Sequence, residues 1–503
     1  MASGDLTHLQ EGAVIPFGGD RFTTVPAELA EVFQPGDHLH IVQTTGALLH
    51  VPAAVREAVR EQVDAAVAAF ERLRTAGTDP VHAFYVAFAD ALADDGVWSQ
   101  ISGANAADVA RAESLGRSTT RLRVSDRMRE DMIEGLRGWA AHVQNAPAAD
   151  VVSRVEHDDW VVETVAAPLG VIAFVFEGRP NVFADAAGVL ATGNTAVLRI
   201  GGDALATARA IQDHALRPAL ERSGLPDGAV RLIPVRERSA GWALFSDARL
   251  ALAVVRGSGT AVTELSSVAR QSGIPVSSHG TGGAWLVADS TADPVRFAGV
   301  VRNSLDRKVC NTLNVAAIVR DRADELVPLL LAAADEAAAA RGGVARVHVA
   351  RGSESWLPAD DLTRTIEVRR AEGTVAEPRA TLIGIEELGT EWEWEETPEL
   401  SLVVVDDVDQ AVRLFNAHSP QFVATLISED PAAHARFRES VNAPFVGDGF
   451  TRWADGQYAL HQPELGLSNW QNGRLLGRGG ILTGADLTTR QTFAHHESAD
   501  QHR

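Results

Sequence analysis

The sequence predicts an α/β fold in which parallel strands alternate with helices. Apolar runs of strand length recur in its middle part, among them "GVIAFVF", "TAVLRI" and "AVRLIPV". Helical segments separate these runs, and the longest, "DALATARAIQDHALRPALERSG", ends at Gly224. Strands spaced by helices of this length form βαβ units and a parallel sheet. A second alternating series begins near Ile274 with "AWLVAD" and "NVAAIVR", which indicates a second α/β domain.

The part of the chain before the first series contains a mixed segment followed by helices. Residues 1–54 combine short apolar runs with Gly and Pro, and His38–Val51 is expected to form a pair of strands that turns at Gly46. From Val55 onwards the apolar residues follow helical spacing, with charged residues on the opposite face. Further helix is expected in "PVHAFYVAFADALAD" and in "RVSDRMREDMIEGLRGWAAHV".

Two other segments depart from the alternating pattern. Val151–Pro168 consists of two β-branched runs on either side of His157-Asp158-Asp159, which predicts a β-hairpin. The last part, about residues 450–503, is rich in Gly, Trp, Gln and Arg and is expected to be irregular.

Charge and composition disfavour several classes of function. The net charge of −22 argues against nucleic acid and anionic membranes as partners, because both are polyanions. A single cysteine cannot form an internal disulfide. The N-terminal residues lack the basic and apolar regions of a signal peptide, and no apolar run reaches the roughly 20 residues of a membrane helix. We therefore expect a cytoplasmic protein without a nucleic-acid partner, a membrane partner or a metal site.

Several motifs, in order along the chain, resemble one protein family. "APLGVIAFVFEGRPNVFADAAGVLATGNTAVLR" (Ala167–Arg199) resembles a block of the γ-glutamyl phosphate reductases, also called glutamate-5-semialdehyde dehydrogenases, of the aldehyde dehydrogenase superfamily. "ANAADVARAESLG", "SGLPDGAV", "IPVSSHGTGGAWLVAD" and "VCNTLN" fit the family in the same order, and "TRWADG" with Glu464-Leu465-Gly466 resembles its late motif. The resemblance spans roughly residues 55–490, and residues before it have no counterpart that we recognise.

The resemblance implies an aldehyde dehydrogenase-like fold with a Rossmann-type nucleotide-binding domain, an α/β catalytic domain and a β-hairpin arm. In this family the arm serves oligomerisation, so a homo-oligomer, either dimer or tetramer, is expected. The expected parts are an N-terminal extension of unknown role (1–54), a cofactor-binding domain (55–150 and 164–275), the arm (151–163), a catalytic domain with the cysteine (276–445), and a return to the cofactor domain with a tail (446–503).

The resemblance also implies a reaction. The family reduces an acyl phosphate to an aldehyde with NADPH and releases phosphate. The expected substrate is γ-glutamyl phosphate or a closely related amino-acyl phosphate, in a step of proline biosynthesis, and NADH is the alternative cofactor.

Cys310, in "NSLDRKVCNTLN", is the expected nucleophile. A lone cysteine is often a small buried hydrophobe, but this one follows a polar, charged loop and stands in the family's cysteine motif. Attack of its thiolate on the acyl carbon would release phosphate and leave a thioester. Lys308 and Arg307 could lower the pKa of the thiol, guide an anionic substrate, or be solvated. The backbone N–H of Cys310 and the amide of Asn181 are candidate oxyanion donors, although Asn181 could instead be a turn residue.

The cofactor residues follow from the same resemblance. Arg199 stands where the superfamily presents a basic residue to the adenosine ribose, and it could pair with a 2′-phosphate or be a solvated residue at a strand end. Gly257, Ser258 and Gly259 should connect a strand to a helix whose N-terminal amides approach a diphosphate. Glu396 falls near the superfamily's nicotinamide-ribose glutamate, although neighbouring glutamates leave the register open.

This sequence departs from the family around the reaction centre. Oxidising aldehyde dehydrogenases need a base to activate water, and Ser278 stands where that carboxylate is expected, with His279 beside it. The absence of a carboxylate in this stretch disfavours aldehyde oxidation by water, and His279 could act as an acid or base or be structural. Asp306-Arg307-Lys308 replaces the family's Gln-Arg-Pro. Arg179 and Arg452 remain candidate anion binders, together with Arg307 and Lys308.

Two other functions stay open at this point. A CoA-acylating or ordinary aldehyde dehydrogenase would use the same cysteine, and exchange of a thioester with CoA needs no base at position 278. A superfamily scaffold that has lost activity and serves a binding role is the non-enzymatic alternative, which the retained Cys310 disfavours.

Overall fold

The computed structural model describes most of the chain and divides it into two compact units. The described residues are 4–117, 119, 122–145, 151–176, 178, 180–257, 259–370, 373–454, 459–460, 464–471, 473–475, 477 and 479–500. Unit 1 comprises Met1–Ser278, Gln462–Gly466 and Ile481–Arg503, and unit 2 comprises His279–His461 and Leu467–Gly480. The chain therefore returns to unit 1 after it has completed most of unit 2.

The first residues of unit 1 form two antiparallel hairpins around a short helix. The second hairpin confirms the expected strand pair, and Gly46 in its turn has a φ of +79°, which L-residues rarely adopt. Leu49 and Val51 are buried in the same cluster as Val171 of the main sheet, so this segment is part of the core of unit 1. The elements are β1 (Val14–Phe17), β2 (Arg21–Thr24), α1 (Ala27–Val32), β3 (His38–Ile41) and β4 (Leu48–Val51).

Four long helices follow these hairpins. On α2 the residues Val55, Val59 and Val63 are buried on one face, as their helical spacing predicts. The helices are α2 (Ala53–Leu73), α3 (Thr78–Ala93), α4 (Asp95–Ser114) and α5 (Asp126–Asn145).

A five-stranded sheet forms the centre of unit 1 in the described part of the chain, with the strand order β11-β10-β7-β8-β9. The pairs β10–β7, β7–β8 and β8–β9 are parallel, which confirms the expected βαβ arrangement. The expected long helix that ends at Gly224 is interrupted by a π-helical turn, Gln212–Leu216. The strands are β7 (Val171–Phe176), β8 (Thr195–Ile200), β9 (Val230–Leu232), β10 (Leu250–Arg256) and β11 (Val276–His279). The helices among them are α6 (Val182–Ala187), α7 (Leu205–Ile211), α8 (Arg217–Ser223), α9 (Ser239–Phe245) and α10 (Gly259–Gln271).

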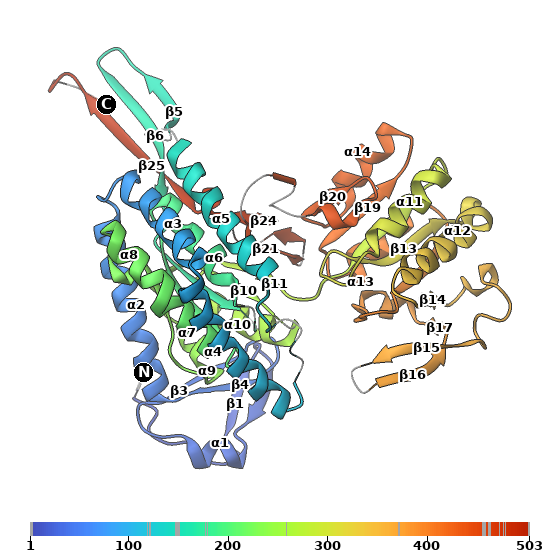
Figure 1. The fold of residues 1–503 in the computed structure, drawn as a ribbon, viewed down its shortest axis with the longest axis horizontal. Helices are drawn as coiled ribbons and strands as arrows, with labels where there is room; N and C mark the ends of the chain where they lie inside the picture. Colours follow the sequence, from blue (N-terminus) through green and yellow to red (C-terminus); the bar gives the residue numbers. More distant parts are fainter. Residues whose placement is uncertain are drawn as a thin grey trace. The chain divides into compact units, whose positions relative to one another are not determined.

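A three-stranded antiparallel arm extends from unit 1 (Figure 1). The expected hairpin is confirmed as β5 (Val151–Glu156) and β6 (Trp160–Pro168). The expectation that the C-terminal part is irregular is wrong for β25 (Thr488–His496), which pairs with β6 along its whole length. At the tip, the ring of Trp160 stacks between those of His157 and His496, at centroid distances of 4.0 and 5.1 Å. The sequence of β25 is mostly polar and exposed, so it lacks the apolar alternation that would have predicted a strand.

A seven-stranded sheet forms the core of unit 2 within the described residues, in the order β17-β14-β18-β13-β12-β19-β20. All six neighbouring pairs are parallel. Two buried hydrophobic clusters cover this sheet, and they include residues of the helices that connect its strands. The strands are β12 (Ala284–Ala288), β13 (Leu313–Val319), β14 (Arg346–Ala350), β17 (Ala380–Ile383), β18 (Glu399–Val405), β19 (Val423–Ile427) and β20 (Phe445–Gly447). The helices are α11 (Pro294–Ser304), α12 (Arg320–Ala339), α13 (Val408–His418) and α14 (Pro431–Ser440).

Smaller sheets complete the fold. The hairpin of β15 (Thr365–Arg370) and β16 (Gly373–Pro378) lies beside β14 and β17 in unit 2 (Figure 1). Near the end of the chain, β21 (Glu464–Leu467) pairs with β24 (Ile481–Thr483), and β22 (Trp470–Gln471) pairs with β23 (Arg474–Leu475). None of the helices in the described ranges is both long enough and apolar enough to cross a membrane.

Candidate active site

Three loops of unit 2 meet at one edge of its sheet. They precede β12, β13 and β18, which are neighbours in the strand order β18-β13-β12. Because adjacent parallel strands begin at the same edge, the loops that lead into them come together. These loops carry Gly282, Cys310 and Glu391 respectively.

The loop that carries Cys310 is held by its own backbone and by Thr312. The carbonyl of Cys310 accepts a hydrogen bond from the N–H of Gly283 at 2.7 Å. The hydroxyl of Thr312 donates to the carbonyl of Arg307 at 2.6 Å and accepts from the N–H of Val309 at 2.9 Å. Cys310 itself is partly exposed and lies on a loop of defined shape.

Gly282 allows the loop before β12 to approach the cysteine closely. A Cβ atom at Gly282 would lie 2.6 Å from the carbonyl oxygen of Cys310 and 2.7 Å from its Cα atom. The same Cβ would also lie 2.7 Å from Oε1 of Glu391. Since both atoms lie 2.7 Å from one point, Oε1 of Glu391 lies close to the Cα atom of Cys310. Only glycine fits at this contact, and the neighbouring Gly283 has a φ of +106°.

Lys308 and Glu391 connect the three loops. The ammonium of Lys308 lies 2.6 Å from Oε1 of Glu391, and the N–H of Gly282 donates to Oε2 of the same carboxylate at 2.5 Å. The side chain of Lys308 is only 8% exposed and that of Glu391 17% exposed. Of the three roles considered for Lys308, the solvated one is therefore wrong.

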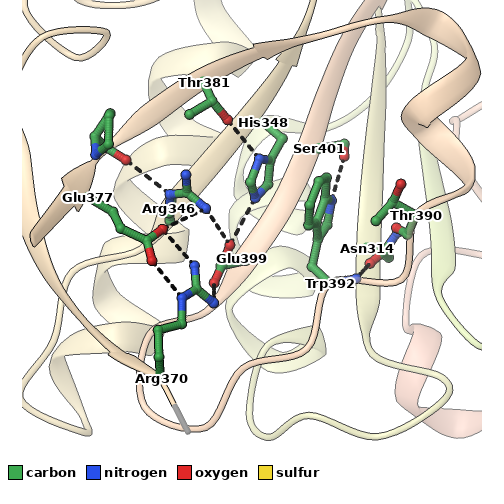
Figure 2. Close-up of polar contacts among 11 residues, drawn as sticks. Asn314, Arg346, His348, Arg370, Glu377, Thr381, Thr390, Trp392, Glu399 and Ser401 are labelled. Carbon is green, nitrogen blue, oxygen red and sulfur yellow. Dashed lines mark hydrogen bonds and ion pairs between the residues drawn. The ribbon is translucent and has the colours of Figure 1, made fainter. Parts of the chain in front are cut away.

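Asn314 fixes the backbone on both sides of Glu391 (Figure 2). Its amide nitrogen donates to the carbonyl of Thr390 at 2.8 Å, and its amide oxygen accepts from the N–H of Trp392 at 3.0 Å. The indole of Trp392 donates to the hydroxyl of Ser401 at 2.8 Å and stacks on the ring of His348 at a centroid distance of 3.5 Å. Glu391 therefore projects from a segment with little freedom to move.

Arg452 holds the other side of the cysteine loop. Its Nε donates to Asp306 at 2.6 Å, and its Nη1 contacts the amide oxygen of Asn311. The amide nitrogen of Asn311 donates to the carbonyls of Arg452 and Ala454, at 3.3 and 3.1 Å. We call Lys308, Glu391, Asp306 and Arg452 the cysteine-loop cluster. Two of the four expected anion binders thus belong to it, because Lys308 and Arg452 already contact carboxylates.

The other residues expected around the reaction centre are less closely connected. Arg307 is exposed on the cysteine loop. Asn181 is half-buried in unit 1, just before α6, and its side chain does not cap that helix. Arg179 lies outside the described residues. His279 is buried, with its ring against that of Phe422 at a centroid distance of 4.6 Å, which favours the structural role.

Three residues expected to bind the cofactor, Arg199, Gly257 and Gly259, lie at or near the ends of β8 and β10 in unit 1. β10 ends at Arg256, and the helix α10 begins at Gly259, so Gly257 lies in a strand-to-helix turn. A turn of this kind directs backbone N–H groups at a helix N-terminus, which suits the diphosphate of a dinucleotide. Ser258 lies outside the described residues.

Arg199 is buried on β8. Its guanidinium donates to the carbonyls of Arg236 and Glu237 at 3.4 Å each, so the solvated alternative is wrong. The guanidinium is a permanent cation near the end of β8, where the family resemblance places the adenosine ribose.

Two glutamates, just before and at the start of β18, have different surroundings. Glu396, the expected ribose ligand, is exposed, whereas Glu399 is 2% exposed. Glu399 contacts Arg346, Arg370 and His348 at 2.9, 2.6 and 2.9 Å (Figure 2). We call Glu399, Arg346, Arg370, Glu377 and His348 the hairpin cluster, because Arg370 and Glu377 come from β15 and β16.

Burial and ion pairing oppose each other in the hairpin cluster. Burial raises the pKa of Glu399, but hydrogen bonds from His348 and Arg370 outweigh it and hold this pKa below its usual value of 4.5. For His348, burial lowers the pKa below 6.5 more than the contact with Glu399 raises it. Glu399 is therefore ionised and His348 neutral near pH 7.

Glu391 is the residue of this site that the sequence did not reveal. It lies 83 positions from Lys308 and is one of several glutamates in an acidic stretch, so no spacing distinguished it. The available signal was the uniqueness of its partner, since Lys308 is the only lysine in the sequence. Position 278, where the water-activating carboxylate is expected, holds a serine. A carboxylate does lie near Cys310, but it is that of Glu391 on another loop, and it is held by two donors.

Comparison with known proteins places these features in a family. The model of the aldehyde dehydrogenase family matches residues 39–343. A γ-glutamyl phosphate reductase of Rhodopseudomonas palustris (strain BisB18) is 30% identical over 404 residues, which cover 78% of this chain and 84% of the relative. That of strain BisB5 is 32% identical over 415 residues, or 79% and 85% of the two chains. The family match begins before the expected limit near residue 55, so β4 and most of β3 belong to the matched region.

Solved structures show the same fold. The γ-glutamyl phosphate reductase of Thermotoga maritima superimposes with a TM-score of 0.74 at 22% identity, and the match covers 88% of this chain and all of that one. An acetylating aldehyde dehydrogenase of Geobacillus thermoglucosidasius gives a TM-score of 0.60 at 16% identity, with 90% and 99% covered. These matches confirm the expected resemblance and the expected α/β fold.

Proposed function

The chain belongs to the aldehyde dehydrogenase family, and we propose that it reduces γ-glutamyl phosphate to the semialdehyde with release of phosphate. The carrying observation is that γ-glutamyl phosphate reductases are about 30% identical over most of the chain. The protein is an NAD(P)-dependent oxidoreductase, and we propose NADPH as the preferred cofactor because Arg199 can pair with a 2′-phosphate. We propose the cytoplasm as its location.

Cys310 is the proposed nucleophile. Its thiolate attacks the acyl carbon, the bond to the phosphate oxygen breaks, and a thioester remains on the sulfur. When bound, the nicotinamide supplies the hydride for the reduction of this thioester. The oxyanion of each tetrahedral species would be stabilised by the backbone N–H of Cys310 and by the amide of Asn181. Support comes from the exposure of Cys310 on a loop that is fixed by neighbouring hydrogen bonds.

Most of the proposed cofactor contacts lie in unit 1. Gly257, Ser258 and Gly259 are the proposed diphosphate contacts, at the N-terminus of α10. Glu396, in unit 2, is retained as the proposed contact of the nicotinamide ribose, because this residue is exposed just before β18.

Arg307 is the leading candidate for binding the substrate anion. It is exposed on the cysteine loop, whereas Lys308 and Arg452 are engaged with Glu391 and Asp306. Arg179 and Arg452 are further proposed contacts of the substrate. The arm formed by β5, β6 and β25 is proposed to join copies of the chain into a dimer or tetramer, as the family resemblance implies.

A direct assay tests the proposed function. Purified protein is mixed with glutamate-5-semialdehyde, NADP⁺ and phosphate, and the absorbance of the reduced cofactor is followed in the reverse direction. Formation of NADPH that depends on phosphate supports the proposal. Turnover without phosphate, or only with CoA, would instead establish an ordinary or CoA-acylating aldehyde dehydrogenase, and no turnover with any acceptor would favour a binding role.

A further inference from the structure

We propose that Lys308 and Glu391 form a positioning pair that sets the shape and the charge around Cys310. This inference rests on the proposed function in so far as Cys310 is the nucleophile. In this proposal Lys308 acts on the cysteine loop and does not serve as the anion binder considered above, and both residues act through the loops that they connect.

The pair joins three segments through one carboxylate. One oxygen of Glu391 accepts from Lys308 on the cysteine loop, and the other accepts from the N–H of Gly282, which lies against the backbone of Cys310. A carboxylate that bridges two donors in this way fixes the spacing between them. The distance between the Gly282 turn and the cysteine loop therefore depends on Glu391.

Asn314 holds the backbone segment that carries Glu391. Asn314 binds the backbone at Thr390 and at Trp392, immediately before and after Glu391 (Figure 2). Asn314 is the second residue of β13, the strand that follows the cysteine loop. The same strand therefore supports both the nucleophile and its carboxylate neighbour. A shift of β13 would therefore change the positions of both Cys310 and Glu391.

The pair also balances charge near the thiol. Lys308 supplies a cation and Glu391 an anion at 2.6 Å, and both are largely shielded from water. Glu393 lies 3.9 Å from Lys308 but is 67% exposed, so its charge acts more weakly. A charge without its partner at this depth acts on a nearby thiolate more strongly than a solvated charge does. Removal of the cation should disfavour the thiolate, and removal of the anion should favour it. Opposite effects of the two substitutions are the distinctive consequence of a charge-balanced pair.

Alkylation of the single cysteine measures this effect directly. The rate of reaction with iodoacetamide is followed against pH, and the pH of half-maximal rate reports on Cys310 alone, since the sequence has no other cysteine. We expect Lys308→Met to raise this pH by about 0.5–1 unit and Glu391→Gln to lower it by a similar amount. The double variant should return to within about 0.2 units of the wild type.

Controls separate this effect from a general disturbance. Lys308→Arg keeps the charge and should restore the wild-type profile. Arg320→Met removes a solvent-exposed ion pair, with Asp406, just beyond the opposite end of β13 and should leave the profile unchanged. Equal shifts in one direction for both single variants, or no shift in either while thermal unfolding shows intact protein, would overturn the proposal.

A kinetic measurement tests the positioning role. Since Glu391 is not proposed to touch substrate, Glu391→Gln should lower kcat by about tenfold with little change in KM. A rise in KM at constant kcat would mean that Glu391 binds substrate instead. The alkylation result does not depend on the identity of the substrate, so the pair can be confirmed even if phosphate-dependent turnover is not found.

Discussion

The hairpin cluster and the cysteine-loop cluster are both built from charged side chains of unit 2, but they stabilise different parts of its structure. In the hairpin cluster two arginines and two glutamates bind mainly one another, and Glu399 at their centre is 2% exposed. In the cysteine-loop cluster Lys308 and Glu391 form one ion pair, and the carboxylate then binds a backbone N–H. The first arrangement secures a hairpin on a sheet, and the second secures the backbone around a reactive thiol. Disruption of the first should cost stability, and disruption of the second should cost reactivity.

The largest expected effect comes from removing the group that the cysteine-loop cluster surrounds. Cys310→Ser should lower kcat by at least about 10³-fold, because the hydroxyl is a far weaker nucleophile than the thiolate. The free energy of unfolding should change by no more than about 0.5 kcal/mol, since the serine is nearly isosteric at a partly exposed position. The reverse assay and a denaturant titration measure the two quantities, and full activity in this variant would dismiss the covalent mechanism.

The hairpin cluster should show the opposite pattern. Glu399→Gln leaves Arg346 and Arg370 with one carboxylate, Glu377, to share and should lower the free energy of unfolding by about 3 kcal/mol. The alkylation profile of Cys310 should stay as in the wild type. Denaturant titration combined with alkylation of the folded variant checks both, and a changed profile with unchanged stability would contradict the division between the two clusters.

The Gly282 contact should combine both kinds of loss. A Cβ atom there meets the backbone of Cys310, which cannot move aside as a flexible side chain would. Gly282→Ala should lower the free energy of unfolding by about 2 kcal/mol and kcat by about tenfold. Gly299→Ala on α11 is the matched control, because nothing lies within 4 Å of its Cβ position and a helix interior favours alanine. If the two variants have the same free energy of unfolding and the same kcat, the close approach of Gly282 to Cys310 affects neither stability nor turnover.

The smallest expected effect is a pH dependence of stability that belongs to the hairpin cluster. The pKa of His348 is below 6.5 in the folded protein, so the unfolded chain binds more protons as the pH falls through 6.5, and stability decreases. The pKa of Glu399 is below 4.5, so its contribution is present above pH 4.5 and is lost below it. His348→Gln should remove the decrease just below pH 6.5 in unfolding curves recorded between pH 7 and 5. An identical pH dependence in both proteins would show that His348 does not contribute.

The sequence predicted those parts of the fold that depend on local pattern. Apolar runs gave β7 and β8, and β-branched runs on either side of a polar turn gave the hairpin β5–β6. The strand β25 was missed because its residues are mostly polar and it is held by pairing with β6. Such pairing is a tertiary effect that no window of the sequence contains.

The candidate site shows the same limit. Cys310 could be predicted, since its motif is contiguous in the chain. Glu391 could not, because its meeting with Lys308 and Gly282 follows from the order of β12, β13 and β18 in the sheet. The odd composition around Cys310 did point to the place where this chain differs from its family, and the contacts of Asp306 and Lys308 give that difference a structural reason.

The return of the chain's last segment to unit 1 has a consequence for how the protein is made. Leu482 and Leu487 are buried in a core of that unit, Asn194 donates to the carbonyl of Leu487 at 2.8 Å, and β25 covers an edge of β6. On the ribosome, β6 emerges long before β25 exists, so the nascent chain carries an unpaired strand edge and an incomplete core through most of its synthesis. Unit 2, whose sequence lies almost wholly between these segments, can reach its native contacts first. Unit 1 can therefore complete its core only after this last segment has been synthesised.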